Sequence, residues 1–276
     1  MGDIVQNVHG VEEAILAKDH PLREMLSSLA PGTASHSERI ASLIEALGTA
    51  AHLNVQRLRC AALLHDIGKV VTPWLYSENQ RTNKEKAFHD TVDPHVSATL
   101  LMGHVAHTTR VLVAHGTIPR DIIDWCSQHH GTCILEQPWR RAVKDHVDAG
   151  GLEEEVDSAL FRYPGPKPTS LEACLLMVCD QTEAMTRALS QSGKLASCKD
   201  IVERVFDKLG QDHQIDNVPF IYWQLRTIKD VLTRELESSY HTRVDYETDE
   251  SAPAPAYTST QATLEVEVTK QTIEEE

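Results

Sequence analysis

Residues that start and stop helices recur along this chain, and between them the apolar positions follow the spacing of an α-helix. Ile40, Leu43 and Leu47, for example, share one helical face, and no convincing strand alternation or internal repeat precedes Glu247. We therefore expect an all-α fold, a helical bundle. The expected helices cover Val11–Leu29 with a break at Asp19–Pro21, Ser37–Ala51, Arg57–Ile67 stopped by Gly68, Pro94–Ala114, Pro119–His130 closed by Gly131, Leu171–Leu189, Lys199–Leu209 and Pro219–Tyr240.

Three other parts of the chain lack this pattern. Residues 70–88 carry a proline, several Asn, Gln and Ser residues and a Lys/Glu cluster, which predicts a loop or lid. The sequence between residues 131 and 161 is less regular. From Glu247 onward, eight acidic residues and one lysine surround a Pro/Ala/Thr-rich middle, a composition typical of disorder. The alternation at Leu264–Val268 leaves open a short strand that pairs with a partner.

Composition excludes several classes of function. The chain has 276 residues, with 26 Lys and Arg against 41 Asp and Glu, a formal net charge of -15. This balance argues against binding duplex nucleic acid or anionic lipid, because both require basic residues to neutralise phosphates. Hydrophobic residues make up 41% of the chain, enough for a core, but no apolar run is long enough to span a membrane. Six cysteines without CxxC spacing, and an N-terminus without a signal peptide, predict reduced thiols in a cytosolic protein.

Histidines and aspartates near helix ends indicate a metal centre. His65 and Asp66 lie near the end of one apolar helix, and His36 starts the helix before it. Adjacent residues on a helix project about 100° apart, so the pair can hold one cation against a neighbouring helix. Asp180 follows an apolar run, where an unpaired carboxylate would be costly to bury and a cation would explain it. These donors suit iron, manganese or another first-row divalent ion. The alternative is a histidine favoured by the helix dipole beside a solvated aspartate.

A second group, His104, His129 and His130, supplies three more imidazoles. The paired histidines could equally cap the C-terminus of a helix. With the first group they provide enough ligands for two metals if Asp66 bridges them, and paired metals favour phosphoester hydrolysis.

The long helix from Pro94 offers two histidines, and periodicity separates them. Nine residues at about 100° each place His95 and His104 on opposite sides of the helix. His104 shares its side with Leu100 and Val111, an apolar stripe that should face the core. We therefore expect His104, and not His95, to face the metals.

Short motifs follow one another in order over about residues 20–246. They are Ala30-Pro-Gly-Thr-x-x-His36-Ser, His65-Asp66-Ile-Gly-Lys69, Glu78-Asn-Gln, His89-Asp90 with Pro94, His104-Val, Gln128-His-His-Gly-Thr132, Phe161-Arg-Tyr-Pro-Gly-Pro-Lys-Pro168, Asp180 and Tyr240-His-x-Arg243. This series resembles the HD-domain phosphohydrolases, and among them the cytosolic domain of the seven-transmembrane HD phosphodiesterases that hydrolyse cyclic di-AMP, a nucleotide second messenger. The proline-rich stretch is the specific part, since a bare His-Asp pair belongs to the whole superfamily.

The resemblance implies a helical HD domain over residues 20–246, a helical lead-in over residues 1–19 and a disordered acidic tail over residues 247–276. It implies two ions, one held by His36, His65, Asp66 and Asp180, the other by His104, His129, His130 and the shared Asp66. Ala34 and Ala87-Phe88 depart from the family pattern, which puts the base contacts and the lid shape in doubt. The family's membrane helices are missing, so the chain is either free-standing or the cytosolic part of a longer membrane protein.

The expected reaction is attack of a metal-bound hydroxide on phosphorus, which opens cyclic di-AMP to the linear dinucleotide. Asp66 and Lys69 are the expected catalytic residues. Lys69 lies on the same helix side as the His-Asp pair and can touch phosphate, although a solvated lysine favoured by the helix dipole is an equal alternative.

Further substrate contacts are expected from the proline-rich stretch. Arg162 is a candidate for the second phosphate and Tyr163 for a base, while Lys167 better suits a stiff structural connection. His89-Asp90 either supports a metal ligand or caps a loop.

Other functions stay open. One is an HD hydrolase of another nucleotide, such as cyclic di-GMP or a nucleoside polyphosphate, and another is a di-iron HD oxygenase. A non-catalytic nucleotide sensor fits less well with a complete ligand set. The expected partner is a small cyclic dinucleotide, and a homodimer is left open.

Overall fold

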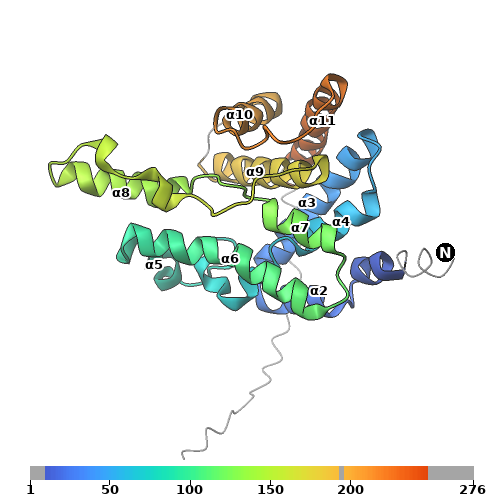
Figure 1. Cartoon of the computed structure of the whole chain (residues 1–276), viewed down its shortest axis with the longest axis horizontal. Helices are drawn as coiled ribbons and strands as arrows, with labels where there is room; N and C mark the ends of the chain where they lie inside the picture. The colour runs from blue at the N-terminus through green and yellow to red at the C-terminus, as the bar shows by residue number, and fades with distance from the viewer. Residues whose placement is uncertain (1–9, 193–195, 248–276) are drawn as a thin grey trace, which may run out of the picture. The chain divides into compact units, whose positions relative to one another are not determined.

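The computed structural model describes residues 10–192 and 196–247, and within these ranges it contains helices and no strand (Figure 1). The expected all-α fold is confirmed. A helix over residues 10–16 comes first. The other helices, with short 3-10 helices marked η, are α2 (Pro21–Leu29), α3 (Pro31–Ala50), α4 (Val55–Leu64), η1 (Ile67–Val71), η2 (Pro73–Leu75), α5 (Asn83–Thr91), α6 (Pro94–His115), α7 (Arg120–Gln128), α8 (Glu136–Asp148), η3 (Glu153–Glu155), η4 (Ser158–Phe161), α9 (Leu171–Gln191), α10 (Cys198–Gln211) and α11 (Tyr222–Glu247).

The chain divides into two compact units, Met1–Ser239 and Tyr240–Glu276, and the candidate site belongs to the first. The predicted acidic tail lies outside the described residues, apart from Glu247 at the end of α11. None of the helices in the described ranges combines the length and the apolar character that crossing a membrane requires. All six cysteines are unpaired and buried, as predicted.

Helix α9 is the central element of the packing. It contacts α3, α4, α7 and α10, and these helices surround it in Figure 1. Every residue from Ala173 to Cys179 is completely buried, as a helix enclosed on all sides requires. Asp180, directly after this run, is therefore held in the interior of the unit.

Helix α3 begins earlier than predicted. The prediction treats Ala30–Thr33 as the end of the preceding helix and begins the next helix at Ser37. In the structure, α2 ends at Leu29 and α3 begins at Pro31. Proline suits the first helical position because its N–H is not needed there and its φ angle is preset. The earlier start places His36 in the second turn of α3 rather than directly before the predicted first residue, Ser37.

The helix that carries the His-Asp pair ends at Leu64, before the predicted Ile67. His65 is its C-terminal capping residue, and the chain continues as η1. Gly68 does not stop the helix as predicted. It lies against α6, where a Cβ atom would be 2.2 Å from the carbonyl oxygen of His104. The missing side chain therefore allows the turn after α4 to approach α6 closely.

Two helices lie where irregular structure was expected. Helix α5 occupies part of the predicted loop, and it begins with a capping box between Thr82 and Glu85. Helix α8 occupies the segment after Gly131. No residue of α5 is buried, and only Pro138 and Ala142 of α8 are, so both segments have few apolar core positions from which the sequence could predict a helix.

The remaining predicted helices are confirmed to within a few residues at either end, except that α11 ends at Glu247 instead of the predicted Tyr240. Helix α6 ends at His115, and the next residue, Gly116, has a φ of 79°, the left-handed conformation typical of a helix end. Helix α9 starts after Ser170, whose side chain accepts a hydrogen bond from the backbone N–H of Ala173.

Candidate metal centre

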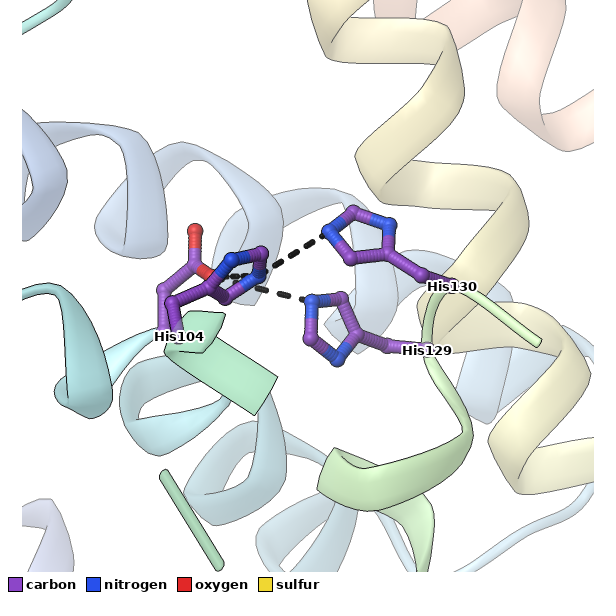
Figure 2. A group of neighbouring side chains, drawn as sticks. His104, His129 and His130 are labelled. Carbon is purple, nitrogen blue, oxygen red and sulfur yellow. Dashed lines mark hydrogen bonds and ion pairs between the residues drawn. The ribbon is translucent and has the colours of Figure 1, made fainter. Parts of the chain in front are cut away.

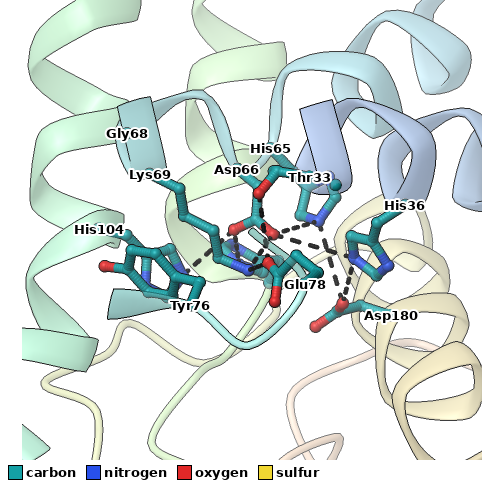
Figure 3. A network of polar contacts seen from close by, with 12 residues as sticks. Thr33, His36, His65, Asp66, Gly68, Lys69, Tyr76, Glu78, His104 and Asp180 are labelled. Carbon is teal, nitrogen blue, oxygen red and sulfur yellow. Dashed lines mark hydrogen bonds and ion pairs between the residues drawn. The ribbon is translucent and has the colours of Figure 1, made fainter. Parts of the chain in front are cut away.

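The seven residues predicted as metal ligands meet in one buried cluster, shown in two parts in Figure 2 and Figure 3. They are His36 on α3, His65 and Asp66 at the end of α4, His104 on α6, His129 and His130 after α7, and Asp180 on α9. His130 is the most open of them, with 16% of its side chain exposed. The packing of five helices thus joins residues that are far apart in the sequence.

Asp66 lies at the centre of the cluster, and its two carboxylate oxygens face different imidazoles. Oδ1 lies 3.3 Å from Nε2 of His104 and 3.6 Å from Nε2 of His129. Oδ2 lies 3.3 Å from Nε2 of His65 and 3.9 Å from Nε2 of His36. The carboxylate joins two groups of potential ligand atoms, each within a span of 4.8 Å. These groups are Asp66 with His104, His129 and His130, and Asp66 with His36 and His65.

Hydrogen bonds on the far side of the rings orient three of these imidazoles. His65, His104 and His129 place Nδ1 at 2.7, 2.7 and 2.6 Å, respectively, from the carbonyl oxygen three residues earlier. This contact requires the ring proton on Nδ1, so the lone pair lies on Nε2, the atom that faces Asp66. Figure 2 shows His104 and His129 turned toward one another together with His130, whose Nε2 lies 3.1 Å from that of His104.

His36 is oriented by a carboxylate that the sequence reasoning missed. Its Nδ1 lies 2.9 Å from Oε2 of Glu183, and its Nε2 lies 3.0 Å from Oδ1 of Asp180. Burial acts to lower the pKa of His36, but these hydrogen bonds outweigh it and raise the pKa to about 9. The same contacts overcome the effect of burial on Glu183 and lower its pKa to about 2. Glu183 follows Asp180 by three residues, a spacing that puts both on one helix face and could have marked Glu183 as a neighbour of the site.

The cluster has the properties of a metal site. Nε2 of His65, Nε2 of His129 and Oδ1 of Asp66 are buried without a hydrogen-bond partner in the described part of the chain. Such an orphaned atom costs about 1–3 kcal/mol, which a cation would offset. Burial lowers the pKa of His104 to about 3, which keeps the ring neutral. Burial opposes ionisation of Asp66, yet Lys69 and His65 hold its pKa well below the usual value. A neutral imidazole such as His104 beside an ionised carboxylate fits first-row divalent ions.

A cavity of about 320 Å³ opens beside the cluster, with Lys69, Tyr163 and His130 in its wall. Nζ of Lys69 lies 2.7 Å from Oδ2 of Asp66 and 2.9 Å from Oε1 of Glu78. These carboxylates overcome the effect of burial and hold the pKa of Lys69 well above its usual value. Tyr163 stacks on His130, with ring centroids 4.2 Å apart. The cavity therefore offers a cation and an aromatic ring next to the ligand cluster.

Arg162 does not line this cavity, contrary to expectation. Its guanidinium donates to the carbonyl oxygen of Thr132 at 2.8 Å and pairs with Asp212 at 2.8 Å. These contacts connect the chain after α7 to the end of α10. Lys167 donates to the carbonyl oxygen of His213 at 2.9 Å, as a structural connection would.

Two further histidines, His95 and His89, lie beyond the cluster. The ring of His95 contacts that of Phe161 at a centroid distance of 4.5 Å. His89 lies 2.8 Å from the carbonyl oxygen of Leu75 and 2.8 Å from Oγ of Ser97. These contacts make His89 a support of the cavity wall rather than of a ligand ring.

Comparison with known proteins places these features in a family. The HD domain family matches residues 33–185, more than half of the chain. The cyclic-di-AMP phosphodiesterase PgpH of Bacillus subtilis is 32% identical over 228 residues, which cover 83% of this chain and 30% of the relative. PgpH of Listeria monocytogenes is 30% identical over 231 residues, which cover 84% of this chain and 31% of the relative. The chain thus spans about 30% of the length of these curated relatives.

Two crystal structures of the L. monocytogenes PgpH HD domain have a similar fold. One has a TM-score of 0.70 at 29% identity, and the other, a complex with cyclic-di-AMP, has a TM-score of 0.71 at 28% identity. Each match covers 81% of this chain and 100% of the crystallised chain. The whole cluster from His36 to Asp180 lies inside the matched family region. The chain therefore belongs to the HD-domain family.

Proposed function

We propose that this protein is a metal-dependent phosphodiesterase that hydrolyses cyclic di-AMP to the linear dinucleotide. The observation that carries the proposal is the position of Asp66, whose two oxygens face two separate groups of imidazoles beside the cavity. The relatives named as cyclic-di-AMP phosphodiesterases, and the similar structure in complex with cyclic-di-AMP, support this substrate.

Two divalent ions, iron or manganese, are proposed to occupy the cluster. Their ligands would be His36, His65, Asp66 and Asp180 for one ion, and His104, His129, His130 and Asp66 for the other. Paired ions supply a nucleophile at neutral pH and neutralise charge on the reacting phosphate.

The chain's own residues prepare the site for such ions and for the substrate. The backbone carbonyls that accept from Nδ1 keep the ligand nitrogens unprotonated. Lys69 holds Asp66 in place and presents positive charge to the cavity, where a phosphodiester would need it. The ring of Tyr163 in the cavity wall is proposed to contact an adenine base. We propose that the domain acts on cyclic di-AMP in the cytosol. The chain would then be either free-standing or the cytosolic part of a longer membrane protein.

The test is product analysis with the metal content measured in the same sample. The protein, loaded separately with Mn²⁺ and Fe²⁺, is incubated with cyclic di-AMP, cyclic di-GMP and a nucleoside polyphosphate, and products are resolved by mass. We expect the linear dinucleotide of adenosine as the main product, and no product with Asp66→Ala. A higher kcat/KM for another nucleotide would overturn the proposed substrate, and oxygen consumption without ester cleavage would overturn the reaction.

A further inference from the structure

Four cationic side chains line the cavity beside the metal cluster, and two of them are already engaged. They are Lys69, Lys86, Arg141 and Arg187. Lys69 pairs with Asp66 and Glu78. Arg141 donates to the carbonyl oxygens of His89 and Val92, which ties α8 to the end of α5.

Arg187 retains its hydrogen-bonding capacity because its neighbouring carboxylate is occupied. Its Nε lies 3.9 Å from Oε2 of Glu183, beyond hydrogen-bond distance. Glu183 already contacts His36 at 2.9 Å and accepts from Arg39 at 2.7 Å. The Arg187 side chain is 30% exposed, so its guanidinium is open to a ligand in the cavity.

The position of Arg187 on α9 directs it toward the metal cluster. It follows Asp180 by seven residues, which is about two turns, or about 10.5 Å, along the same helix face. Side chains on a helix lean toward its N-terminus, so the guanidinium reaches back from its own turn toward Asp180. A ligand that touches the cluster at one end can therefore meet Arg187 at the other.

Lys86 approaches the same cavity from α5, a different wall. It is exposed and lies in the cavity wall. The acidic residues in the cavity wall are Glu78 and Asp180, which are both paired, and Asp90. Besides Lys69 and Arg141, the cavity wall therefore contributes two cations, Arg187 and Lys86, that can meet an anion.

A cyclic dinucleotide has two phosphodiesters, and only one can react at the metal cluster at a time. The other carries a full negative charge into a partly enclosed cavity, which is costly without a counter-charge. The guanidinium suits this role because it binds phosphate oxygens through two parallel N–H donors. We propose that Arg187, with Lys86, binds the phosphodiester that is not being cleaved. This inference rests on the proposed function and gives that site a basis for preferring substrates with two phosphodiesters.

The experiment compares two substrates that differ in the second phosphate. Cyclic di-AMP has it, whereas bis(p-nitrophenyl) phosphate is a single phosphodiester that needs only the metal cluster. Arg187→Ala should raise KM for cyclic di-AMP about tenfold or more, as loss of a charge-assisted hydrogen bond does. Turnover of the single diester and bound metal should change less than about twofold. Arg187→Lys should restore part of the affinity, and Lys86→Ala should raise KM about threefold or more.

Two exposed residues provide matched controls. Lys84 lies on α5 but outside the cavity wall, and Arg120 lies on α7 in a pair with Asp124. Their alanine variants should leave both substrates unaffected. Equal losses on both substrates with Arg187→Ala, together with metal loss, would show that Arg187 acts through Glu183 and would overturn the inference. An unchanged KM for cyclic di-AMP would overturn it while leaving the proposed function intact. No turnover of cyclic di-AMP by the unmodified protein would overturn both.

Discussion

The Nδ1 atom of His36 lies 2.9 Å from Oε2 of Glu183, a carboxylate that comes one helical turn after Asp180 on α9. The contact joins α3 to α9 and turns the other nitrogen of the ring toward the cluster. Arg39 holds the second oxygen of Glu183 at 2.7 Å, so the carboxylate is fixed on both sides. A carboxylate thus orients the ring of His36, whereas backbone carbonyls orient the rings of His65, His104 and His129.

Glu183→Gln should therefore weaken metal binding at the His36 side of the cluster. Carboxylates that orient a ligand histidine typically contribute 10- to 100-fold to metal affinity, so we expect a loss of about that size. Metal titration followed by inductively coupled plasma mass spectrometry measures it. Glu172→Gln, in the first turn of the same helix, is the control, and equal losses in both variants would contradict the prediction.

Asp66→Ala should abolish hydrolysis and lower the metal content of both groups, because one carboxylate serves two sets of imidazoles. Asp180→Ala should mainly deplete the group that contains His36, its partner at 3.0 Å. The ratio of bound metal to protein, measured on both variants, checks this contrast. Full activity of Asp66→Ala would end the two-metal proposal, and equal depletion by Asp180→Ala would mean that this residue is wrongly assigned.

The two histidines of α6 provide a test of which side faces the metals. His104→Ala should lose metal and turnover, because its Nε2 lies 3.3 Å from Asp66. His95→Ala should keep both, because its ring packs on Phe161. Metal content and kcat are compared for the two variants. Metal loss confined to His95→Ala would refute the periodicity argument and the placement of His104 together.

Gly68→Ala should destabilise the fold and disturb the cluster at once. The added Cβ would lie 2.2 Å from the carbonyl oxygen of His104 and 2.3 Å from the backbone nitrogen of Thr108, so η1 must move away from α6. Overpacking of this kind costs about 1–3 kcal/mol, and we expect Tm to fall by about 5 °C. Thermal unfolding followed by circular dichroism measures the shift.

Gly103→Ala on α6 is the matched control for that substitution. Its Cβ would meet only the His107 ring, at 3.8 Å, an ordinary contact distance. Alanine is also the better helix former, so Tm should stay or rise slightly. A similar fall in both variants would show that close approach at Gly68 is not the cause.

Local spacing predicted those features that depend on one helix. The apolar run before Asp180 indicated a buried carboxylate, and the angular separation of His95 and His104 indicated which one faces the interior. Helix α5 was missed because its start is marked only by the pair Thr82 and Glu85 in an otherwise polar segment.

Contacts between distant segments could not be predicted in this way. Arg162 was expected at the substrate because of its motif, yet its partner Asp212 lies fifty residues later and is brought to it only by the packing of the helices. The contact of His36 with Glu183 spans 147 residues, and no single-helix pattern specifies which face of α3 meets α9. Pairings of this kind depend on the tertiary arrangement.

His65 and His129 are the C-terminal capping residues of α4 and α7. Their Nδ1 atoms contact the carbonyl oxygens of Ala62 and Cys126, respectively. The last four carbonyls of a helix, to which these two belong, have no hydrogen-bond partner within the helix. The same ring therefore terminates a helix with one nitrogen and offers the other to a cation. An ion that immobilises the ring also suppresses fraying of the turn behind it. Hydrogen exchange in the final turns of α4 and α7 should accordingly slow as metal is added, so that amide protection becomes a gauge of occupancy that needs no substrate.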